Sequence, residues 1–167
     1  MAYTGISTVE TSEAAWLTRF GDGLPTLLTV NGGPWDVIQA FWTRTPATQK
    51  TQIYVMSLEI TDDRSANIRT MPRHQIVLEL HWPLRETTSP LAEQTQQGFK
   101  NAIDLLVQRI RGPVSDKTHG GAFLSVGEVP REQAIHVAIE PPWQTIPASK
   151  ELAARVTYYA DDFEINV

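Results

Sequence analysis

Residues 74–111, HQIVLELHWPLRETTSPLAEQTQQGFKNAIDLLVQRIR, decide the fold because they join a strand to a long helix. From Ile76 to Trp82, apolar side chains occupy every second position, which is the period of a strand. After Pro90 they recur every three or four residues, which is the period of a helix with one buried face. That apolar stripe consists of Phe99, Ile103, Leu106 and Ile110. We therefore expect a helix from Pro90 to Arg111 that packs one face against a sheet.

Both ends of this predicted helix carry typical boundary residues. Ser89 suits an N-cap that is followed by proline in the first turn. At the other end, Gly112 and Pro113 stop the helix, and Arg109 lies in the last turn, where a positive charge favours the helix dipole.

Strands are predicted on both sides of this segment. The predicted strands other than 74–82 are residues 36–43, 52–60, 123–129, 134–139 and 152–160. Residues 61–67 are polar and connect 52–60 to 74–82, which predicts an antiparallel pair with a long hairpin tip. Near the N-terminus, Trp16, Leu17 and Phe20 recur at helical spacing before Gly21, which predicts a short helix. The fold class expected is α+β, with residues 1–167 as a single domain. Its mostly antiparallel mixed sheet carries one long helix packed on a face and a shorter N-terminal helix.

Composition excludes several classes of site. The 167 residues include no Cys, so a disulfide framework, a thiolate metal site and a thiol nucleophile are excluded. The formal net charge of -5 argues against a protein that coats nucleic acid by charge alone. The sequence contains neither a Walker A motif nor GxGxxG, and it has no apolar run of membrane-spanning length. We expect no cofactor and no membrane partner.

The chain offers no evident catalytic or metal-binding constellation. Its four histidines lack metal-ligand spacing and are predicted as polar surface or sheet-edge residues: His74, His81, His119 and His136. Residues 114–121, including His119-Gly120-Gly121, are expected to form an exposed loop, because the glycine loop of hydrolases would need an accompanying nucleophile elbow. No catalytic, cofactor-binding or metal residue is predicted, and the protein is expected not to be an enzyme.

Charged pairs on the predicted strands have a structural interpretation. Glu79 and His81 share one face of their strand, which favours cross-strand partners. Asp161 and Asp162, adjacent near the end of the sequence, are expected to be solvated.

Interface residues are predicted from loop aromatics and the charged hairpin. Trp35 and Trp143 follow prolines in loops, where exposed aromatic side chains are typical of protein interfaces. The alternative is that both tryptophans fold back onto the core. The predicted interface consists of Trp35, Asp62, Asp63, Arg64, Pro142 and Trp143.

The order and texture of these elements resemble the tail terminator proteins of long-tailed bacteriophages. The resemblance covers most of the chain and has no diagnostic motif. It begins with the short N-terminal helix and continues in 36–42 (DVIQAFW), 75–82 (QIVLELHW), the helix at 91–111 and the closing strand 152–159 (LAARVTYY).

The resemblance implies a non-catalytic virion protein of the tail or neck, assembled in the host cytoplasm. Proteins of this family form a homo-oligomeric, hexameric ring that ends tail-tube polymerisation and joins the tail to the head. The implied partners are further copies of the chain, the tail-tube protein and a head-completion or connector protein, while DNA only passes through the lumen. Three alternatives stay open: another neck or tail-tube component, a small α+β hydrolase that uses His119 or His136 with an acidic partner, and a monomeric ligand-binding module.

Overall fold

The structure is a computed structural model, and we describe the parts of the chain that it places. These are residues 5–21, 23–41, 50–66, 69–84, 90–112, 117–126, 135–141, 151–162 and 165–166. The helices are α1 (Ile6–Thr18), the 3-10 turn η1 (Thr29–Asn31) and α2 (Leu91–Arg111). The strands are β1 (Val37–Ala40), β2 (Gln52–Ala66), β3 (Arg69–Pro83), β4 (Ser125–Val126), β5 (His136–Ile139), β6 (Glu151–Asp161) and β7 (Ile165–Asn166).

All the described strands belong to one sheet, whose central order is β1-β2-β3-β6. Beyond β6, β5 and β4 pair with different parts of its outer edge, and β7 pairs with the start of β3. The β1–β2 pair is parallel and the others are antiparallel, so the sheet is mixed but mostly antiparallel, as predicted.

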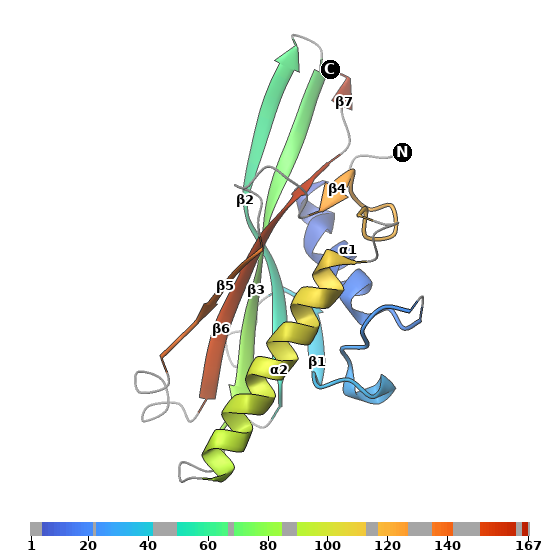
Figure 1. The fold of residues 1–167 in the computed structure, drawn as a ribbon. Coiled ribbons are helices and arrows are strands. Elements are labelled where there is room, and N and C mark those ends of the chain that lie inside the picture. Colours follow the sequence, from blue (N-terminus) through green and yellow to red (C-terminus); the bar gives the residue numbers. More distant parts are fainter. Residues whose placement is uncertain are drawn as a thin grey trace.

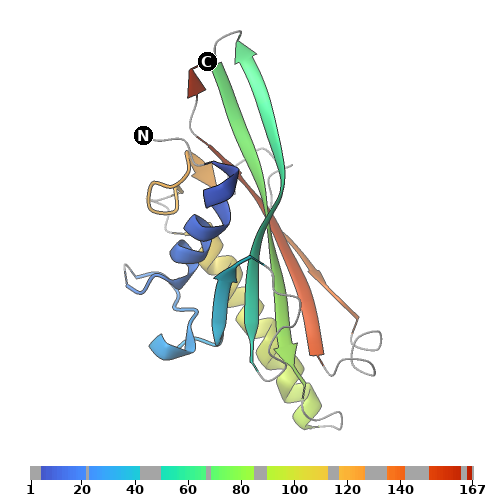
Figure 2. The same ribbon diagram turned by 180° about the vertical axis from the view of Figure 1, so that it is seen from behind.

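The two α-helices cover one face of this sheet (Figure 1, Figure 2), which confirms the predicted α+β class. The apolar stripe of α2 is buried as expected, and the ring of Phe99 lies 5.7 Å from that of Trp82 on β3. On β6 the alternation is also as predicted, because Leu152, Ala154 and Val156 all lie in the core.

Two predicted boundaries differ at the helices. The first helix begins at Ile6 and ends at Thr18, so Phe20 lies beyond it and is 67% exposed instead of extending the apolar face. At α2 the N-cap position is Pro90, and Ser89, the predicted cap, lies outside the described residues.

The hairpin formed by β2 and β3 is longer than predicted, because both strands continue through what was expected to be a polar tip. Pairing extends to Ala66 and Arg69, with a bulge at Leu58, the residue between Ser57 and Glu59 that has no partner in register. We call residues 62–66 and 69–72 the distal ribbon. Figure 1 shows this part of the hairpin extending beyond both helices.

Candidate functional site

Arg109, on α2, holds the end of α1. Its buried guanidinium donates to the carbonyl oxygens of Trp16 at 2.6 Å, Arg19 at 2.7 Å and Pro25 at 3.3 Å. It also lies 4.8 Å from the centre of the Trp16 ring, a cation–π distance. Because the last carbonyls of a helix lack partners within that helix, Arg109 serves as a cap for α1 supplied by another element. Arg109 lies in the last turn of α2, as predicted, but its guanidinium caps the end of α1.

A second buried polar group, the Glu13 cluster, consists of Glu13 on α1, His119 in the loop before β4 and Tyr158 on β6. The Oε1 atom of Glu13 lies 2.7 Å from Nδ1 of His119 and accepts a 2.5 Å hydrogen bond from the Tyr158 hydroxyl. The other ring nitrogen of His119, Nε2, lies 2.8 Å from the carbonyl oxygen of Ile110. The cluster thus joins α1, β6 and the loop before β4, which are far apart in the sequence, to the end of α2.

Hydrogen-bond chemistry fixes most of the protons in the Glu13 cluster. A carbonyl oxygen only accepts, so Nε2 of His119 must donate to Ile110. Nδ1 then either donates to the Glu13 carboxylate or accepts from a protonated Glu13, and one proton is shared within the pair. Burial first, and then the charge and hydrogen bond of Glu13, raise the pKa of Tyr158 well above its usual value of about 10. Tyr158 is therefore a hydroxyl donor across the neutral range.

His119 is a core residue, which corrects the prediction of an exposed loop. Its side chain is stacked on Trp16 with a ring separation of 4.8 Å, and the residue is only 3% exposed. The backbone of His119 is left-handed, with φ of 49°, and the two glycines that follow it have positive φ as well. These glycines allow the tight turn that directs the imidazole inward. Because a substrate cannot contact a side chain so enclosed, this burial argues against His119 as a hydrolase base.

The third buried polar group is the pair of His74 on β3 and Asp162 after β6. Their side chains are fully buried, and Nε2 of His74 lies 2.8 Å from Oδ2 of Asp162. The predictions that His74 lies at the surface and that Asp162 is solvated are both wrong. Only the adjacent Asp161 is near the surface, where it binds Arg73 at 2.9 Å. Asp162 fixes the point at which the chain leaves β6, since its backbone N–H also donates to Pro72.

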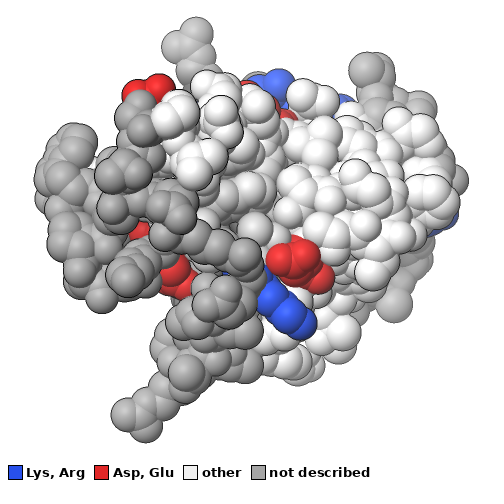
Figure 3. Space-filling model, turned by 90° about the horizontal axis from the view of Figure 1, so that it is seen from below, with Lys and Arg blue, Asp and Glu red and all other residues white. Residues whose placement is uncertain are grey.

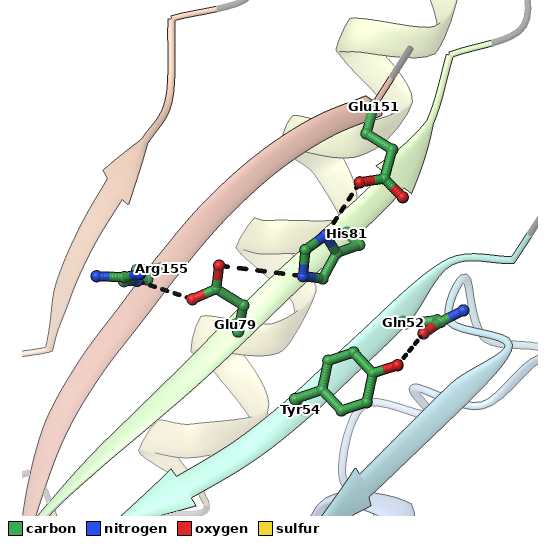
Figure 4. Close-up of polar contacts among 6 residues, drawn as sticks. All are labelled: Gln52, Tyr54, Glu79, His81, Glu151 and Arg155. Atoms are coloured by element: carbon green, nitrogen blue, oxygen red, sulfur yellow. Dashed lines mark hydrogen bonds and ion pairs between the residues drawn. The ribbon is translucent and has the colours of Figure 1, made fainter. Parts of the chain in front are cut away.

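On the opposite face of the sheet, a row of polar residues crosses three strands (Figure 4). Glu79 on β3 binds Arg155 on β6, its partner in register, with a distance of 2.7 Å from Oε2 to Nε. His81 lies between two carboxylates, with Glu151 at 3.2 Å from Nδ1 and Glu79 at 4.0 Å from Nε2. These contacts confirm the prediction that Glu79 and His81 have cross-strand partners.

A shallow hollow lies beside this row, at the β5 edge. It has a volume of about 310 Å³ and is lined by Ala138, Ile139, Glu140, Pro141 and Arg155. None of the histidines lines it, and among the described residues no group of three or more His, Asp or Glu side chains is placed to hold a metal ion. His136 is exposed on β5.

Much of the outer edge of β2 has no described strand beside it. Strand β1 pairs with β2 only at residues 52–55, and the N–H of Ser57 donates to Glu10 on α1 at 2.8 Å. From Leu58 to Ala66 no described strand pairs with the outer side of β2. We call residues 58–66 the free edge. Leu58, at the bulge, is 62% exposed there.

The predicted interface residues have different outcomes. Trp35 is fully buried, with its ring 5.2 Å from that of Trp82, so the structure corrects the prediction of an exposed loop aromatic and supports the core alternative. The backbone of Asp62, Asp63 and Arg64 belongs to β2, in the distal ribbon, but the positions of their side chains lie outside what is described. Pro142 and Trp143 also lie outside the described residues.

The burial of Arg109, of the Glu13 cluster and of the His74–Asp162 pair was not predicted from the sequence. Only His119 had a local sequence signal that could have indicated it. A histidine next to two glycines predicts a turn, and a turn can direct a side chain inward as well as outward. The partners lie 88 to 106 residues apart in the His74–Asp162 and Glu13–His119 pairs, so no local pattern links them.

The surface charge of the described residues and the comparisons with known proteins do not indicate a particular function. Figure 3 shows the end of the molecule opposite the distal ribbon, where the described surface is largely uncharged and has no broad basic patch. No described helix has the length and apolar character needed to cross a membrane. No protein-family model matches the chain, and no curated protein matches it either.

Proposed function

We propose that the protein is a structural virion component, a tail terminator that closes into a homo-oligomeric ring at the end of a phage tail tube. The observation that carries the proposal is the free edge of β2 together with the distal ribbon, which stands outside the helix-covered sheet. A ring requires each copy to present a patch that fits a different patch on the next copy. A projecting strand edge is a suitable patch because its backbone groups are already aligned for pairing.

The rest of the molecule is suited to a rigid ring subunit. Buried side chains of Arg109, Glu13 and Asp162 tie both helices, the loop before β4 and the end of β6 to one sheet. The net charge of -5 favours a lumen that repels DNA and lets it pass. In this proposal the tail-tube protein and a head-completion or connector protein contact the two faces of the ring.

The first test is the mass of the purified full-length protein by native mass spectrometry, with negative-stain images of the same sample. We expect a closed ring, hexameric if the family resemblance holds. The second test adds the protein to growing tail tubes, and we expect the tubes to stop at a defined length. Tubes that elongate equally with and without the protein would contradict the proposal. A monomer that leaves the tubes unaffected would favour a monomeric binding module.

A further inference from the structure

The distal ribbon has too few strands to be stable alone. Over residues 62–66 and 69–72 the described pairing is that of β2 with β3, with a third strand from β7 at just Arg69 and Thr70, and the N–H of Asp162 donates to Pro72 at the base of the ribbon. Strand β6, which supports the rest of β3, ends opposite Arg73. An isolated two-stranded hairpin is marginally stable in water, whereas three strands or a packed face give independent stability. Within the part of the chain that the structure describes, the ribbon therefore has no neighbouring strand on the β2 side.

Among the described residues, the β2 edge is covered only as far as Ser57. Strand β1 pairs with its first four residues, and the Glu10 carboxylate accepts the N–H of Ser57. The free edge then runs for nine residues, 58–66, a length of about 30 Å at the usual rise of a strand. Proteins that remain monomeric usually protect such an edge with a short strand, lysines or a covering segment. Here the first residue of the free edge is an exposed leucine.

We infer that the free edge of β2 accepts a strand from a second copy of this chain, so that the sheet continues across the subunit interface. This inference rests on the proposed ring. Strand addition provides main-chain hydrogen bonds along the part of the free edge that the added strand covers, and it can supply a third strand to the distal ribbon.

The chain itself contains a second strand edge, which is why another copy fits. In the sheet order, β5 lies on the far side from β2 and pairs only with β6 among the described strands. Each copy thus presents two different edges, and a contact between unlike edges is head-to-tail, the kind from which rings are built. Along β5, Ala138 and Ile139 are exposed.

The test compares two matched double variants of the full chain. Leu58→Lys with Thr61→Lys places two cations on the free edge, where both residues are exposed. Val30→Lys with Thr29→Lys makes the same chemical change at exposed positions of η1, away from either edge. Oligomer mass is measured by native mass spectrometry, and amide exchange of residues 58–66 is followed by hydrogen–deuterium exchange.

We expect residues 58–66 of the wild-type oligomer to exchange at least tenfold more slowly than in the dissociated chain. The Leu58/Thr61 variant should lose that protection and weaken assembly at least tenfold, while the Val30/Thr29 variant should behave like wild type. An oligomer that forms without protection of residues 58–66, or that both variants form equally well, would overturn the inference and leave the ring proposal intact. A wild-type chain that neither assembles nor caps tail tubes would overturn both.

Discussion

The helix-covered body and the distal ribbon of the same sheet are stabilised in different ways. In the body, strands β2, β3 and β6 lie under two helices, and three buried polar groups hold segments that are distant in the sequence. In the distal ribbon, the described contacts are backbone pairs between β2 and β3, a two-residue addition from β7 and the hydrogen bond from the Asp162 N–H to Pro72. The difference indicates that the body is held by many contacts between distant segments, whereas the described part of the ribbon is held mainly by the pairing of two strands.

The largest effect should come from removing the cap of α1. Arg109→Met removes the buried guanidinium from the carbonyls of Trp16, Arg19 and Pro25, and we expect a loss of about 3–5 kcal/mol in the free energy of unfolding. Urea denaturation followed by circular dichroism measures it. The matched control is Arg111→Met, on the exposed side of the same helical turn, which should change stability by less than about 0.5 kcal/mol. Equal effects of the two changes would contradict the capping role.

A smaller effect is expected at the end of β6, where two adjacent aspartates have different environments. Asp162→Ala removes the partner of buried His74 and should destabilise the protein by about 2–4 kcal/mol. Asp161→Ala breaks the pair with Arg73, which is 40% exposed, and should change stability by less than about 1 kcal/mol. Thermal unfolding of both variants measures the difference. If Asp161→Ala lowered the stability more than Asp162→Ala, the His74–Asp162 pair would not be the contact that stabilises the end of β6.

Raising the pH above about 10 should lower the free energy of unfolding of the body, because of Tyr158. Its pKa is raised in the folded state, so above about pH 10 the tyrosine ionises in the unfolded chain while it stays protonated in the folded one. The stabilisation is complete below pH 10 and decreases above it, by up to about 1.4 kcal/mol for each pH unit. Tyr158→Phe lacks this dependence, so the stability difference between wild type and variant should shrink between pH 10 and 11. Urea unfolding curves at pH 8, 9, 10 and 11 test this, and parallel pH profiles would contradict it.

The smallest effect on the body should come from changes on the free edge. We expect Leu58→Lys with Thr61→Lys to shift the unfolding free energy of the dissociated chain by less than about 0.5 kcal/mol, because both positions are exposed. Urea unfolding at a concentration where the chain is dissociated measures it. A large loss would mean that the free edge contributes to the body and that the two regions are not independent.

The sequence predicted the parts of the fold that depend on local periodicity. The α2 stripe around Phe99 and Leu106 and the alternation of Leu152 to Val156 are buried as expected, because one element contains the whole pattern. The buried contacts of His74 and His119 could not be predicted, because each needs a carboxylate that only the complete fold brings close.

The candidate interface was less predictable than the fold. Trp35 follows a turn of polar and glycine residues, yet its ring reaches the core because residues 27–35 fold back on themselves, with Trp35 donating to the Leu27 carbonyl. The free edge could not be predicted from periodicity either. Residues 61–66 are polar, which suggested a loop, but strand pairing uses the backbone and does not require apolar side chains.

The bulge at Leu58 has a geometric consequence for any assembly. Bulges increase local twist and bend the strand, so this single unpaired residue sets the direction in which the distal ribbon leaves the body. Deleting Leu58 would leave the pairs on either side, Ser57 with Ile76 and Glu59 with Gln75, in one uninterrupted ladder. The ribbon would then point elsewhere, and the angle between neighbouring subunits would change with it. If the ribbon forms the contact between subunits, the presence of this one extra residue in β2 determines how many copies make up the ring.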